Sequence, residues 1–341
     1  MLRSGIIVSG VATIDRIMAV DHYPAEGSLA DVGEAAVSTG GALCNVLLDL
    51  SKLDPAIPLY AVGVIGQDEL GDKTFAALQR ARHADLSGVV RAGKACYTDV
   101  YESMESHQRT FFHQRGANRM LDVKHFDFER CKAKILYIGY VMLLDALDGP
   151  DAEYGTCMAR LLNDARGNGL ETCIDVVSLK SARFREIAAP ALKHATYCVI
   201  NETEAQEITG FVLRGDAGTL QEENVASALK ALLSGGVAKW AVIHTPEASF
   251  GMDKSGAYYR EQGAKLAHGY IKGTVGAGDA FCAGVLCVAH GGGALPKALR
   301  AGNAAACSSL RLTGATEGVL PLPEALRLYD QLCHLCDGEE R

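Results

Sequence analysis

The sequence has 341 residues, of which 48% are hydrophobic and 22% charged, and its formal net charge is −8 at pH 7. Because α/β domains often run past about 250 residues as one unit, residues 1–341 are expected to form a single domain. The negative charge opposes a phosphate backbone, and no basic stripe with interleaved aromatic residues overrides it, so no nucleic-acid partner is expected. The first apolar run is too short to span a membrane, so no membrane partner is expected either.

The eleven cysteines are scattered through apolar runs, as at Cys173, Cys198 and Cys282. In such surroundings a cysteine behaves as a small buried hydrophobic residue. The pattern therefore favours free thiols and a reducing, cytoplasmic location over a disulfide framework.

Short apolar runs recur along the chain, separated by stretches with helical periodicity. The helical stretches include residues 43–53 and 226–233, where apolar residues return on one face. This alternation predicts an α/β fold, with a mostly parallel central sheet covered by helices on both faces. The apolar runs are residues 6–8, 59–62, 135–138, 173–174, 198–200 and 241–243.

Two segments depart from this alternation because no crossover helix separates their strands. Residues 13–20 with 30–38, and 95–102 with 109–113, show the polar alternation of paired strands. They predict a small antiparallel β lid, formed by residues 13–38 and 95–114, that projects from the main sheet.

Ligands of open α/β sheets bind beyond the carboxyl ends of the strands. The residues that follow the predicted strands are therefore the first candidates for a site. These residues are Gly10, Gly63, Asp175, Asn201 and His244.

The first candidate motif is Gly40-Gly41, followed by Asn45 at the start of a helix. Adjacent glycines let a polyol approach the backbone closely, and an asparagine amide both donates and accepts hydrogen bonds to hydroxyl groups. A purely structural Gly-Gly turn before a helix has the same sequence. The motif alone therefore does not distinguish a substrate-binding turn from a structural one.

The second candidate is Asn201 with Glu204, directly after a predicted strand. Asparagine followed three residues later by glutamate is also a helix capping box, which is a structural device. Its place at the carboxyl end of a strand suits it equally to holding the waters of a Mg²⁺ ion.

The third candidate is the segment of residues 273–281, GTVGAGDAF, which runs into a predicted helix. Glycines at the start of a helix let backbone N–H groups converge at its positive dipole end and form an anion site. Asp279 would lie beside a phosphoryl group bound there and take the proton of an attacking alcohol. The alternative reading is a tight turn in which Asp279 only complements the helix dipole.

In this order, the three motifs resemble those of the ribokinase-like (PfkB) carbohydrate kinase family, and the resemblance spans nearly the whole chain. Residues 40–45 (GGALCN) resemble its first signature, and residues 276–281 (GAGDAF) its second. Residues 62–71 (VGVIGQDELG) are similar to the family pattern V-G-x-x-G-x-D-x-x-G. The resemblance implies a three-layer α/β/α sandwich whose β lid closes over a sugar.

The activity implied by the resemblance is phosphoryl transfer from ATP, with Mg²⁺, to a hydroxyl of a sugar or sugar-like molecule. Asp279 would be the base, and the amides of Gly276, Ala277 and Gly278 would form the anion hole. The substrate residues would be Asp15, Gly40, Gly41, Asn45 and Asn118. The nucleotide residues would be Asn201, Thr245, Thr274 and Asn303, and Asn201 and Glu204 would hold Mg²⁺ through water.

The sequence departs from the family pattern at three places. The family pattern D-x-N-x-R appears only as residues 175–180 (DVVSLK), which retain the aspartate but not the asparagine. Gly273 stands where the family usually has an aspartate of a monovalent-cation loop, so the resemblance gives no support for K⁺ activation. Pro246 removes a backbone donor where the family has a Gly-x-x-Gly turn over the nucleotide phosphates. The nucleotide is then held differently, or the phosphoryl donor is not ATP.

Alternatives stay open for the substrate, the activity and the assembly. A nucleoside kinase of the same family would differ in substrate and not in mechanism, and a catalytically silent sugar or nucleotide sensor would have no need of Asp279. Arg109, Arg115 and His113 in the lid either meet a charged substrate or form a solvated strand face. An exposed polar lid also suits pairing with a second lid, so a homodimer is expected by analogy.

Overall fold

The computed structural model describes residues 3–106, 109–179, 181–215 and 218–334. Within them, nine strands form one sheet in which β1, β4, β5, β8, β11, β12 and β13 are parallel, as predicted, and β14 and β15 are antiparallel at one edge. In sheet order the strands are β15 (Tyr258–Gln262), β14 (Ala248–Asp253), β13 (Trp240–His244), β12 (Tyr197–Asn201), β11 (Glu171–Val176), β8 (Ile135–Val141), β1 (Ile6–Gly10), β4 (Leu59–Ile65) and β5 (Ala84–Arg91).

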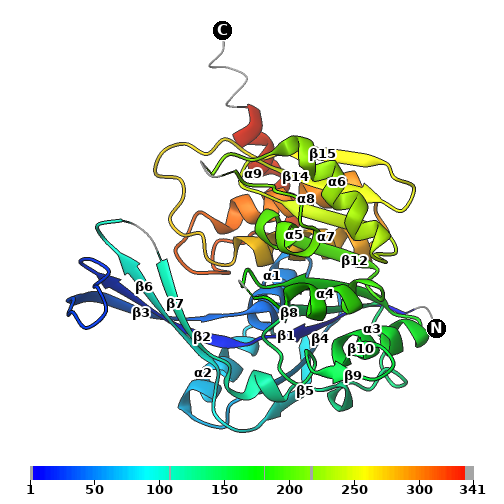
Figure 1. Cartoon of the computed structure of the whole chain (residues 1–341), viewed down its shortest axis with the longest axis horizontal. Coiled ribbons are helices and arrows are strands. Elements are labelled where there is room, and N and C mark those ends of the chain that lie inside the picture. Colours follow the sequence, from blue (N-terminus) through cyan, green and yellow to red (C-terminus); the bar gives the residue numbers. More distant parts are fainter. Residues whose placement is uncertain (1–2, 107–108, 180, 216–217, 335–341) are drawn as a thin grey trace.

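Helices cover both faces of this sheet and bury two apolar cores, which confirms the three-layer prediction (Figure 1). Strands buried on both faces need near-continuous apolar sequence, which the predicted runs supply. One face carries α1 (Ala42–Leu53), α2 (Glu69–Leu78), α7 (Ala277–His290) and α8 (Leu295–Ser309), with α9 (Leu322–His334) packed on α8. The other carries α3 (Cys157–Gly167), α4 (Phe184–Leu192), α5 (Glu202–Thr209) and α6 (Glu222–Ser234).

The lid is a second sheet that extends away from the main sheet at its carboxyl-end side (Figure 1). Its strands follow the order β3 (Val32–Gly40), β2 (Thr13–Val20), β6 (Tyr97–Ser103) and β7 (Arg109–Gln114). The two antiparallel pairs are present as predicted, and a parallel pairing of β2 with β6 joins them. Residues 107–108 of the predicted lid lie outside the described residues.

Short elements complete the described chain: the 3₁₀ turns η1 (Gly116–Met120) and η2 (Val123–His125), and the hairpin of β9 (Pro150–Asp151) and β10 (Gly155–Thr156). The ten described cysteines are free thiols, as expected. Among the described helices, none combines the length and the apolar character needed to cross a membrane.

Candidate active site

Helix α7 begins at the Gly-Ala-Gly turn, and Asp279 lies in its first turn with only 4% of its surface exposed. Gly276 precedes the helix with φ of 77°, and an added Cβ there would lie 2.5 Å from the carbonyl oxygen of Ala315, so a side chain does not fit. The first N–H groups of a helix have no intrahelical acceptor and lie at its positive end. Asp279 is therefore a buried carboxylate beside backbone suited to a phosphoryl group.

Two side chains hold the carboxylate of Asp279. Asn45 Nδ2 donates to Oδ2 at 2.7 Å, and the Tyr140 hydroxyl donates to Oδ2 at 2.8 Å and to Oδ1 at 3.0 Å. Burial raises the pKa of Asp279, while these hydrogen bonds act in the opposite direction because they favour the charged form. The carboxylate is thus fixed in orientation, and the two hydrogen bonds favour its ionised form against the effect of burial.

The turn before α1 brings Asn45 to this position. Gly41 caps the helix with φ of 83°, and a Cβ there would lie 2.5 Å from the carbonyl oxygen of Val11. The neighbouring Gly40 faces Asp15, whose carboxylate an added Cβ would overlap. The two glycines therefore let the chain pass between the first strand and the lid, with Asn45 aimed at Asp279.

One cavity of about 500 Å³ collects these groups at the carboxyl ends of the strands, between the main sheet and the lid. Its volume is within the range usual for small-molecule sites. Of the residues expected from the sequence, it is lined by Asp15, Gly41, Asn45, Asn201, Glu204, Gly276, Gly278 and Asp279. Three motifs far apart in the sequence are thereby brought to a single site.

Asp15 lies on the lid side of the cavity. Burial raises its pKa to about 6, the hydrogen bond to Thr98 lowers it, and the negative charge of Asp279 raises it further. Thr98 in turn shares a 3.0 Å hydrogen bond with His113 Nδ1. These three lid residues form a polar row that is able to accept and donate hydrogen bonds to a polyol.

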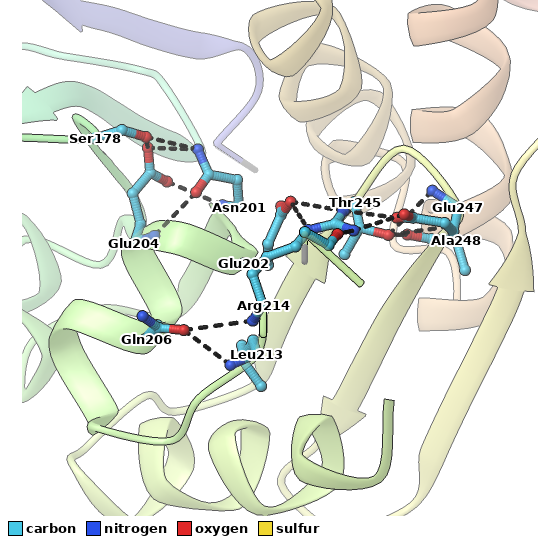
Figure 2. Close-up of polar contacts among 11 residues, drawn as sticks. Ser178, Asn201, Glu202, Glu204, Gln206, Leu213, Arg214, Thr245, Glu247 and Ala248 are labelled. Carbon is cyan, nitrogen blue, oxygen red and sulfur yellow. Dashed lines mark hydrogen bonds and ion pairs between the residues drawn. The ribbon is translucent and has the colours of Figure 1, made fainter. Parts of the chain in front are cut away.

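Asn201 and Glu204 form the capping box of α5, so the structural reading of this motif is correct. Asn201 Nδ2 donates to Glu204 Oε1 at 2.8 Å, and the Ser178 hydroxyl donates to the same oxygen at 2.9 Å (Figure 2). Burial raises the pKa of Glu204 to about 7. Both residues also line the cavity, so the cap does not preclude a role in binding.

Two further strand ends supply polar side chains to the cavity, Asp175 of β11 and His244 of β13. Burial raises the pKa of Asp175, and Glu204 and Asp279 add to this through their negative charges. Burial lowers the pKa of His244 to about 4, so its imidazole is neutral and brings no positive charge. By contrast, Gly63 lies inside β4 and does not line the cavity, and an added Cβ there would contact the side chain of Leu43.

Several expected residues lie outside the lining of this cavity. The Asn118 side chain donates to the carbonyl of Ala12 at 3.0 Å and accepts from the N–H of Ala12 at 3.2 Å. The Asn303 amide donates to the carbonyl of Gln262 at 3.1 Å. Thr245 accepts from the amide of Ala248 at 3.1 Å and closes the turn that contains Pro246. Gly40, Thr274 and Ala277 do not line the cavity either.

Next to Asn201, an ion-pair cluster ties the chain after α5 to the turn after β13 (Figure 2). Arg214 donates to both carboxylate oxygens of Glu247, at 2.6 and 2.7 Å, and to Glu202 at 2.9 Å. Arg214 Nη1 also donates to the carbonyl of Gly218 at 3.0 Å. Every guanidinium nitrogen of Arg214 therefore has an acceptor, and the cluster fixes two segments beside the cavity.

Tyr140, Thr98 and His113 all line the cavity. From the sequence, Tyr140 and Thr98 were given no role, and His113 was expected either to meet a charged substrate or to lie on a solvated strand face. Tyr140 follows the apolar run of residues 135–138, so the strand-end rule could have identified it. Thr98 on β6 and His113 on β7 are opposite each other on neighbouring strands of the lid. Only the strand register shows that they share a face.

Solved structures with this fold include two ribokinases and a nucleoside kinase. The Arabidopsis thaliana ribokinase, solved with ribose and ATP, matches with a TM-score of 0.76 at 18% identity, over 96% of this chain and 99% of its own. The ribokinase of Giardia lamblia matches with a TM-score of 0.76 at 19% identity, over 95% and 99%. A Methanocaldococcus jannaschii nucleoside kinase of the ribokinase family matches with a TM-score of 0.73 at 14% identity, over 97% and 100%.

The fold is thus that of the ribokinases, and a lid, a helix N-terminus and a buried carboxylate meet at its cavity. The family model of the pfkB carbohydrate kinases matches residues 4–322, which is nearly the whole sequence. The chain therefore belongs to the pfkB family and is a carbohydrate kinase, a phosphotransferase. No curated protein matches the sequence closely enough to count as a relative.

Proposed function

We propose that this kinase transfers the γ-phosphoryl group of ATP to a hydroxyl of a sugar-like substrate, with Asp279 as the general base. The observation that carries the proposal is the position of Asp279, buried in the first turn of α7 and held by Asn45 and Tyr140 at the wall of the shared cavity. The family and the ATP complex of a fold neighbour support the donor assignment.

In this mechanism the acceptor hydroxyl lies between Asp279 and the amides of Gly276 to Gly278. Phosphoryl transfer passes through a loose transition state, so Asp279 mainly orients the hydroxyl and accepts its proton late. The backbone amides at the start of α7 stabilise the charge that develops on the transferred group. Asp15, Gly41 and Asn45 position the rest of the substrate by contacts to its hydroxyl groups.

Mg²⁺ fits the end of the cavity formed by Asp175 and Glu204, because both carboxyl groups line it. In the described residues, no three His, Cys, Asp or Glu side chains are grouped to chelate a metal directly. Glu204, with Asn201 beside it, would therefore hold the ion through water, as Mg²⁺ commonly requires. When bound, the ion neutralises charge on the phosphates.

The test is ADP release by the purified protein with Mg²⁺–ATP and a panel of pentoses, hexoses, sugar acids and nucleosides. We expect turnover with at least one acceptor, and its loss when EDTA removes Mg²⁺. Ligand-induced thermal stabilisation without turnover on any acceptor would instead support a silent sensor. A pyrophosphate or ADP donor that works where ATP fails would contradict the assignment of the donor.

A further inference from the structure

The inner face of the lid carries two parallel rows of side chains with different chemistry. Strand register places Asp15 opposite Thr98, and Thr98 opposite His113, which makes the polar row. Two residues farther from Asp15 and Thr98, Ile17 pairs with Val100, and Val100 pairs with Phe111, which lies two residues before His113 on the antiparallel strand β7. Because residues two apart on a strand share a face, this second, apolar row borders the same cavity as the polar row.

The spacing of the rows sets the length of a ligand that uses both. Two residues along a strand span about 7 Å. A sugar ring held by the polar row, next to Asp279, therefore leaves the apolar row for a substituent on that ring. Phe111 is 61% exposed and borders the cavity, so an aromatic face is available to such a substituent.

The cavity also selects by charge. Neither lysine nor arginine occurs among its lining residues in the described chain, whereas Asp15, Asp175, Glu204 and Asp279 all do. Burial lowers the pKa of His113, and the charge of Arg115 lowers it further, so the uncharged form of the imidazole is favoured. On the lid side, an anionic substituent would lie near Asp15 and Asp279, and no lysine or arginine of the described residues lines the cavity to balance its charge, which is costly in a buried site.

Arg109 and Arg115, the arginines considered for a charged substrate, do not change this conclusion, because each already has a carboxylate partner. Arg109 pairs with Glu102 at 3.0 Å, and Arg115 pairs with Asp145. The reading in which they meet a charged substrate is therefore not favoured by the structure.

Resting on the proposed kinase function, we propose that the substrate is a nucleoside, a pentose that bears an uncharged planar heterocycle. The sugar binds at the polar row beside Asp279, and the heterocycle stacks on Phe111 over Ile17 and Val100. Stacking on an aromatic side chain tolerates different bases, because every base presents a π face. Sugar acids and phosphosugars are excluded by the charge of the cavity.

The experiment compares kcat and KM for several nucleosides, free ribose, methyl β-ribofuranoside and a sugar acid, in the wild-type protein and in Phe111→Ala. We expect the nucleosides to have the highest kcat/KM. Phe111→Ala should raise their KM roughly 5- to 150-fold, the range for loss of a base–aromatic contact, and leave kcat and the KM of methyl β-ribofuranoside nearly unchanged. Phe112→Ala is the matched control, since Phe112 is the next residue of β7, is 54% exposed and faces away from the cavity.

Preference for a free sugar or a sugar acid over every nucleoside would overturn the inference while leaving the kinase function standing. An equal loss for all substrates in Phe111→Ala, or the same loss in Phe112→Ala, would also overturn it, because either result indicates a general role of the lid. If no acceptor is phosphorylated, the kinase proposal fails separately. Nucleoside-induced thermal stabilisation that Phe111→Ala abolishes would then still support the binding site, and its absence would reject it.

Discussion

The carboxylate of Asp279 depends on donors that come from two other parts of the chain. Tyr140 stands at the end of β8 and Asn45 in the first turn of α1, and both donate to Asp279 Oδ2. In a buried site, each of these hydrogen bonds favours the ionised form that a base needs. Their loss should therefore change both the rate and its pH dependence.

Removal of the Tyr140 hydroxyl tests this coupling. In Tyr140→Phe the pKa of Asp279 should rise further, because a hydrogen bond that lowers it is lost while burial remains. The acidic limb of the kcat–pH profile should then move to higher pH, and kcat near neutral pH should fall about 10- to 100-fold, in line with a lost hydrogen bond to a charged group. Tyr60→Phe is the control, because Tyr60 lies near the amino end of β4 beside Gly5. An unshifted profile in Tyr140→Phe would contradict the coupling.

At this scale the sequence predicted the residues that belong to local motifs and missed those that do not. Asp279 and Asn45 each follow a helix-capping glycine, Gly276 or Gly41, that has a positive φ and no room for a side chain. Such glycines are visible in the sequence as part of the motif. Thr98 and His113 carry no such signal, because a single polar residue on a strand becomes a site residue only through its register. Asn118 and Asn303 matched the family pattern, yet their side-chain amides donate hydrogen bonds to backbone carbonyls.

Among the elements, α1 and α7 form the frame of the site, and their interface contains an unusual carboxyl group. Asp49 lies one turn after Asn45, is fully buried, and neither of its oxygens has a hydrogen-bond partner among the described residues. Burial raises its pKa well above the usual 3.8, and the charge of Asp279 acts in the same direction. The folded protein therefore binds this proton more tightly than the unfolded chain does.

The sign of the pH dependence follows from that difference. Because the folded pKa lies above the unfolded value, stability from Asp49 is present below about pH 4 and is lost as pH rises toward the folded pKa. Asp49→Asn removes this loss, so we expect the variant to be more stable at pH 7 by roughly 1–3 kcal/mol and less dependent on pH. Urea unfolding from pH 4 to 8 measures both effects. A less stable variant with unchanged pH dependence would show that Asp49 makes a stabilising contact in solution.

The elements themselves were largely predictable, because apolar runs and helical periodicity are local properties. The pairing of β2 with β6 was not, since the two strands are about 80 residues apart and nothing local states that they lie in parallel. Likewise, β14 and β15 extend the sheet in antiparallel order without a strong apolar run at β15.

At the scale of the whole molecule, the lid leaves apolar side chains on its outer face and edges. Val37 of β3 is 61% exposed and Phe112 of β7 is 54% exposed, on a sheet whose edge strands are open. Such a surface suits pairing with a second copy. We therefore predict a homodimer through the lid. Size-exclusion chromatography with light scattering should give twice the chain mass, and Val37→Asp should reduce it to one chain mass. A monomer for the wild-type protein would contradict this prediction.

The proposed role of Asp279 as the base of a phosphoryl transfer is tested by kcat of Asp279→Asn. With the best acceptor and saturating Mg²⁺–ATP, we expect kcat to fall by about 10²–10⁴-fold, the range for loss of a general base. Ligand-induced thermal stabilisation should persist, and Asp49→Asn, which alters another buried carboxyl group nearby, should keep most of its activity. A kcat for Asp279→Asn within a few fold of the wild-type value would contradict the account.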